Sequence, residues 1–94
     1  MGSETRVAVL GVVVSDPGSV EDLNQILHLY SQYIIGRMGI PYSAKKINLI
    51  SVAVDAPLDV ISALAGKIGK LPGVSAKTAY SNVVTAIEHD KTPD

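Results

Sequence analysis

The side chains that most often perform catalysis are sparse in this sequence. It has no cysteine and only two histidines, His28 and His89, so thiolate nucleophiles, disulfides and thiolate metal sites are excluded. His28 falls in a predicted helix and has no carboxylate four residues away on either side, where a partner would share its helix face. No set of nucleophile, base and orienting group can be proposed from the spacing. We therefore predict a protein that is not an enzyme and uses no metal or cofactor.

The first candidate binding site is the turn Asp16-Pro17-Gly18-Ser19, which follows an apolar run and precedes a predicted helix. A helix start has unpaired backbone N–H groups and a partial positive charge, and both favour a bound effector. The same residue types also serve a plain turn and helix cap, with Ser19 and Asp22 approximating a capping box. Both interpretations, a ligand-binding loop and a structural turn, stay open at this stage.

The second candidate is the segment Gly36-Arg37-Met38-Gly39 in a predicted strand. Glycines in a strand allow a ligand or another backbone to approach closely, and a guanidinium can hold a carboxylate or phosphate through two hydrogen bonds. Alternatively, the segment is a bulged strand at a subunit interface, where Arg37 is solvated and Met38 fills a gap. Of the two interpretations, we favour the interface.

The chain of 94 residues is too short for two separate cores, so we predict one domain over 1–94, with a core of about 6–83 and polar tails at 1–5 and 84–94. Eight basic and nine acidic residues give a formal net charge of −1, which argues against direct binding to nucleic acid. No apolar run approaches the roughly 18 residues of a membrane span. The N-terminus has no signal-peptide pattern. With the lack of cysteine, this predicts a cytoplasmic protein and no membrane partner.

Apolar periodicity and turn residues predict four strands and two helices. Gly36, Gly39 and Pro41 require the first helix to end near Tyr30 to Tyr33, and Gly69 ends the second. The order strand, helix, strand, strand, helix, strand predicts an α+β fold of the ferredoxin-like βαββαβ kind, with a four-stranded antiparallel sheet and both helices on one face. The expected strands are 6–14, 33–42, 47–55 and 74–83. The first helix is expected to follow Ser19, and the second is expected to open at Ala56-Pro57, with Pro57 in its first turn.

The first predicted strand is apolar on both of its faces. Alternation along the strand puts Val9 and Val13 on one side and Leu10 and Val12 on the other, and the strand at 47–55 is nearly as apolar. Two helices cover one face only, so the other face would expose apolar surface to water. Leaving such surface exposed forgoes about 25 cal/mol of stabilisation per Å². We predict that a second subunit covers this face or the sheet edge, in a homo-oligomer such as a dimer or tetramer. The alternative is that the tail of the same chain covers this face, or that the monomer tolerates its exposure to water.

Several segments resemble known proteins. VVVSDPGSVEDLNQIL is similar to the opening of ACT domains, and LPGV is similar to the turn into their fourth strand. YIIGRMGIPY and INLISVAVDAPLDVISALAGKIGKLPGVSAKTAYS resemble a small family of regulators of the iron-only hydrogenase system. With the first strand and helix, this similarity covers roughly residues 6–82. It implies a stand-alone ACT-like domain, similar in fold to the C-terminal domain of nickel-responsive regulators.

The resemblance carries over only in part. ACT domains often hold an effector at the loop that matches residues 16–19, but they place a residue between the aspartate and the proline, which are adjacent here. The nickel-responsive relatives bind metal through several histidines and a cysteine, so their site does not transfer. They also have a DNA-binding segment before the first strand, which here begins by residue 6.

The sequence therefore predicts a non-enzymatic regulatory or oligomerising module linked to the iron-only hydrogenase system. In one version the module senses a small-molecule effector. In the other it is a protein–protein adaptor that acts without a ligand.

Overall fold

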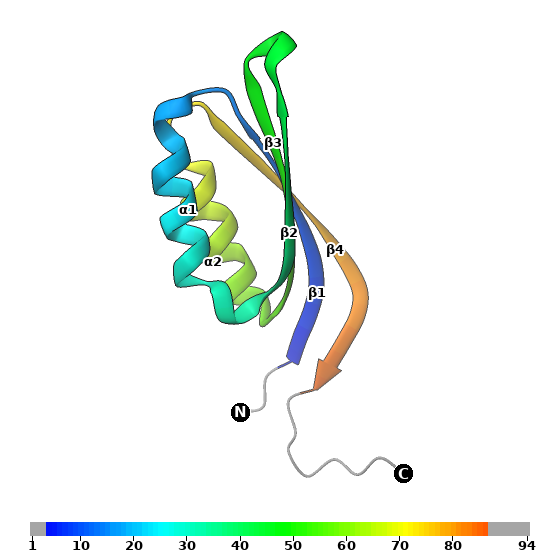
Figure 1. The fold of residues 1–94 in the computed structure, drawn as a ribbon. Helices are drawn as coiled ribbons and strands as arrows, with labels where there is room; N and C mark the ends of the chain where they lie inside the picture. The colour runs from blue at the N-terminus through cyan, green and yellow to red at the C-terminus, as the bar shows by residue number, and fades with distance from the viewer. Residues whose placement is uncertain (1–3, 87–94) are drawn as a thin grey trace.

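The chain folds as a four-stranded antiparallel sheet with two helices, as the computed structural model describes for residues 4–86. The strand order is β2-β3-β1-β4, which confirms the predicted ferredoxin-like arrangement. Both helices lie on one face of the sheet, and no helix covers the other face (Figure 1). The elements are β1 (Glu4–Val14), α1 (Val20–Leu29), β2 (Ile34–Tyr42), β3 (Ile47–Ala56), α2 (Leu58–Gly69) and β4 (Val74–Ala86).

Strand β1 is the centre of the structure, because it pairs with β3 on one side and with β4 on the other. Its side chains alternate as predicted. Leu10 and Val12 are at most 2% exposed beneath the helices, whereas Val9 and Val13 on the opposite face are 41% and 37% exposed. The core is therefore a single layer between the sheet and the helices.

Each helix contributes one apolar stripe to this layer. Residues spaced three and four apart share a helix face, and the fully buried residues of both helices follow this spacing. The buried helical residues are Leu23 and Leu27 on α1 and Ile61, Leu64 and Ile68 on α2.

The strands at the two chain ends are longer than predicted. The ladder between β1 and β4 continues past a register shift between Arg6 and Ala8, so that Glu4 lies opposite Ala86. The predicted polar tail from residue 84 is therefore wrong for 84–86, because these residues pair with β1 and extend β4. The remaining predicted tail, including His89, lies outside the described residues.

The predicted capping box is not formed. Pro17–Ser19 forms a short 3₁₀ turn, so Ser19 already has helical backbone angles and its side chain makes no capping hydrogen bond to α1. The Ser19 hydroxyl is instead 2% exposed and donates to the carbonyl oxygen of Pro72 at 2.6 Å. It joins the turn before α1 to the turn before β4.

Gly73 allows these two turns to meet. It has a φ of +68°, and the Ser15 backbone N–H donates to its carbonyl oxygen at 2.7 Å. A Cβ atom at Gly73 would lie 2.6 Å from the Cβ of Asp16, which is far inside van der Waals contact. Only glycine fits both the backbone conformation and the space.

We expect Gly73→Ala to lower the free energy of unfolding by about 2 kcal/mol or more, because the left-handed conformation alone costs an L residue roughly 1–2 kcal/mol. Urea denaturation measures the change. Gly66→Ala is the matched control, since a Cβ atom there meets nothing within 4 Å. In the interior of α2 this substitution should raise stability by about 0.5–1 kcal/mol. Equal effects at the two glycines would contradict this account.

Candidate functional site

A groove runs between α1 and the edge strand β2. Two hollows of about 340 and 270 Å³ make up this α1–β2 groove, and both are lined by Asn24 and Arg37. His28 and Ile34 line the first hollow, near the end of α1. The residues that line the second include Val20, Gly39, Pro41, Asn48 and Ile50.

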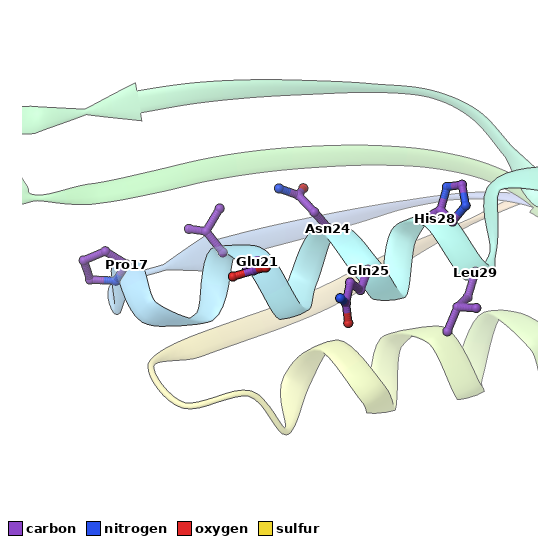
Figure 2. Close-up of a pocket in the computed structure, with 7 residues that line it drawn as sticks. Pro17, Glu21, Asn24, Gln25, His28 and Leu29 are labelled. Atoms are coloured by element: carbon purple, nitrogen blue, oxygen red, sulfur yellow. The ribbon is translucent and has the colours of Figure 1, made fainter.

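The helix positions that line the groove come from one edge of α1. Val20, Asn24 and His28 are four residues apart, which places them in a row along the helix. Figure 2 shows Asn24 and His28 projecting from α1 on the side of the strands. A third, more open hollow of about 760 Å³ continues from this row over the outer surface of α1, past Glu21 and Gln25.

Arg37 crosses the groove from β2 to α1. Its register opposite Val52 places its side chain on the helix side of the sheet, and its Nη2 donates to Oδ1 of Asn24 at 2.9 Å. The next residue, Met38, lies opposite Ser51 on the helix-free face and is 61% exposed. The predicted strand bulge is present as a register shift between Ile34 and Gly36. The four residues of the second candidate segment thus divide between two surfaces.

The first candidate segment forms a turn whose backbone donors are already used. The N–H of Gly18 donates to Oδ1 of Asp16 at 2.9 Å, the N–H of Ser19 to the Asp16 carbonyl at 3.0 Å, and the N–H of Val20 to the Pro17 carbonyl. These are the groups that an effector would need at this helix start. The geometry favours the structural turn, and effector binding at residues 16–19 stays an untested prediction.

The face of the sheet without helices, here called the open sheet face, carries a group of exposed apolar side chains from its three neighbouring strands. Between 37% and 61% of each side chain is exposed. Gly11 lies among them and leaves a depression of about 240 Å³ that is also lined by Met38 and Leu49. The exposed apolar members are Val9, Val13, Met38, Ile40, Tyr42 and Leu49.

Within residues 4–86, no group of three or more His, Cys, Asp or Glu side chains could hold a metal ion. His28 is exposed on α1, and it lines its hollow together with the polar residues Asn24, Ser31 and Arg37. In the same part of the chain, no helix is long and apolar enough to cross a membrane.

Comparison with known proteins decides the family. Residues 6–78 match the family described as "TM1266-like: Iron-only hydrogenase system regulator, putative". The uncharacterized protein TM1266 from Thermotoga maritima has a solved structure that is 31% identical, with a TM-score of 0.78, over 81% of this chain and 96% of that one. The chain belongs to the TM1266-like family. The resemblance predicted from the sequence is confirmed.

Other solved structures share the fold of this TM1266-like chain at lower identity. A formyltetrahydrofolate deformylase from Pseudomonas putida KT2440 gives a TM-score of 0.60 at 14% identity, over 82% of this chain and 29% of that one. An unknown protein from Galdieria sulphuraria gives a TM-score of 0.58 at 20% identity, over 84% of this chain and 46% of that one. None of the curated proteins matches.

The α1–β2 groove was only partly visible in the sequence. The sequence marks Arg37 and Gly39 as candidate site residues and His28 as a histidine without a catalytic partner, but it does not single out Asn24 or Asn48. The one local signal was the spacing of Asn24 and His28, four apart beside the apolar stripe of α1. Their approach to Arg37 depends on tertiary packing.

The contacts of Ser19 generate a prediction for the turn at residues 16–19. Ser19→Ala should lower the free energy of unfolding by about 1 kcal/mol, because it removes the hydrogen bond to Pro72. Chemical denaturation measures this loss. Ser62→Ala, at an exposed position of α2, should stay within about 0.5 kcal/mol of the parent. An unchanged stability of the Ser19 variant would show that this contact does not join the two turns.

Proposed function

We propose that this chain is a non-enzymatic regulatory module of the iron-only hydrogenase system, and that it works as a homo-oligomer assembled through the open sheet face. Membership of the TM1266-like family supports the link to the hydrogenase system. The observation that carries the assembly is the exposed apolar side of β1, β2 and β3.

The open sheet face has the properties of a surface that is buried in use. Ile40 is 50% exposed and Met38 is 61% exposed, and both lie beside Leu49 and Val13 rather than singly among polar residues. Contiguous apolar patches of this kind mark association surfaces in folded proteins. Burying them against a partner removes apolar area from water at about 25 cal/mol per Å².

A second copy of the same chain fits this face. By register, Asp55 lies opposite Val7 and Lys77 opposite Gly11, so two opposite charges lie on the same face at different margins of the apolar group. In a two-fold dimer the same surface of each copy faces the other, so any pairing of one copy's acidic residue with the other copy's basic residue occurs twice. The depression at Gly11 gives a neighbouring side chain room to insert.

Regulation by assembly also agrees with residues 4–86, in which no group of three or more His, Cys, Asp or Glu side chains could hold a metal ion. The module needs neither a nucleophile nor a metal to present a composite surface to a partner. We place it in the cytoplasm, in keeping with a cysteine-free sequence.

We expect Leu49→Lys to convert the oligomer into a folded monomer, because a lysine at the centre of the face would be desolvated on assembly. Light scattering coupled to size-exclusion chromatography at micromolar concentration gives the mass. Circular dichroism establishes that the variant is folded. Met38→Lys on the edge strand provides a second variant at a more exposed position.

Leu29→Lys is the matched control. Leu29 is 73% exposed on α1, in the helix layer, so the same substitution there should leave the mass of the oligomer unchanged. A parent protein that is monomeric throughout the concentration range would refute the assembly. So would a Leu29 variant that dissociates as readily as the Leu49 variant.

A further inference from the structure

Arg37 is a charged side chain whose contacts in the α1–β2 groove leave room for a ligand. A guanidinium has five N–H donors in a planar fork. The hydrogen bond to Asn24 uses one of them, and its acceptor is a neutral amide oxygen rather than a carboxylate. A carboxylate can accept two parallel hydrogen bonds from a guanidinium and offset its charge, whereas the amide oxygen of Asn24 accepts one and carries no charge. An incoming carboxylate would therefore compete well for Arg37.

The groove beside Arg37 also has space for an apolar group. Gly39 shares the helix-facing side of β2 with Arg37, and a Cβ atom at Gly39 would meet nothing within 4 Å. The surrounding hollow of about 270 Å³ is lined by the apolar Val20 and Ile50 and by the amide of Asn48. This is the size of space that a small organic molecule occupies.

We propose that the α1–β2 groove binds a small organic carboxylate with a short branched apolar tail. The carboxylate lies on the Arg37 donors that form no hydrogen bond within residues 4–86, and the tail lies over Gly39 against Val20 and Ile50. A singly charged group fits better than a phosphate dianion, because one guanidinium and two neutral amides face the hollow. Bidentate pairing with Arg37 supplies the orientation.

The position of the site gives it a direct route to the open sheet face. Arg37 and Gly39 face the groove, while the alternating residues Met38 and Ile40 lie on the open sheet face of the same strand. A ligand that moves β2 relative to α1 also moves these two apolar side chains. As an effector site this proposal rests on the proposed function, but as a binding site it stands independently.

Isovalerate is the probe, and isovaleramide, which has the same shape without the charge, is its control ligand. We expect isovalerate to bind the full chain saturably in calorimetry and to shift the amide resonances of Asn24, Arg37 and Gly39 in NMR spectra. Isovaleramide should bind at least about tenfold more weakly, because it has one acceptor oxygen in place of two and no negative charge to pair with Arg37.

Two variants test the two halves of the site. Arg37→Gln should raise the Kd about tenfold or more through the loss of the guanidinium. Gly39→Val should also weaken binding, since its side chain would project into the hollow, where a Cβ atom meets nothing within 4 Å. Lys70→Gln removes one positive charge from the end of α2, outside the groove, and should keep the Kd within about twofold of the parent.

The proposal is overturned if isovalerate does not bind, if isovaleramide binds equally well, or if inorganic phosphate binds where isovalerate does not. It is also overturned if Arg37→Gln and Lys70→Gln weaken binding equally. The proposed function is judged separately by the mass of the Leu49→Lys variant. A stable oligomer that ignores isovalerate would therefore remove the groove as a carboxylate site and favour the adaptor without a ligand.

Discussion

The burial of β1 is the interaction on which the rest of the structure depends. This strand makes hydrogen-bonded ladders on both sides, and Leu10 and Val12 on its covered face are almost fully buried by the helices. The opposite face cannot be covered in the same way, because both helices lie on one side of the sheet (Figure 1). The hydrophobic core and the exposed apolar face therefore arise from a single strand that is apolar on both sides.

The edge strand β2 connects the two surfaces that matter for function. Its residues alternate between the groove and the open sheet face, so one strand supplies Arg37 to the first and Met38 to the second. Among residues 4–86 no further strand pairs with β2 at this edge, and α1 is its neighbour on the helix side. Gly39 shares the helix side of β2 with Arg37 and has no side chain, which leaves the groove open beside Arg37.

The layers and the core could be predicted from sequence because they follow from periodicity. The alternation around Leu10 and the stripe through Ile61 and Leu64 are local patterns that the structure repeats. The hydrogen bond of Ser19 to Pro72 and that of Arg37 to Asn24 could not be predicted in this way. Each joins segments that are brought together only by tertiary packing, and Ser19 by itself has the features of a helix cap.

The strand order has a consequence for how the chain reaches this structure. Val9 lies between Ala53 and Ala79, so the first strand to be synthesised finds its two neighbours only much later in the chain. Pairing over such separations requires the closure of long loops, which slows folding. Until then both apolar faces of β1 are exposed to other chains, the condition under which folding intermediates aggregate. The sheet can be completed only when β4, its last strand, has left the ribosome.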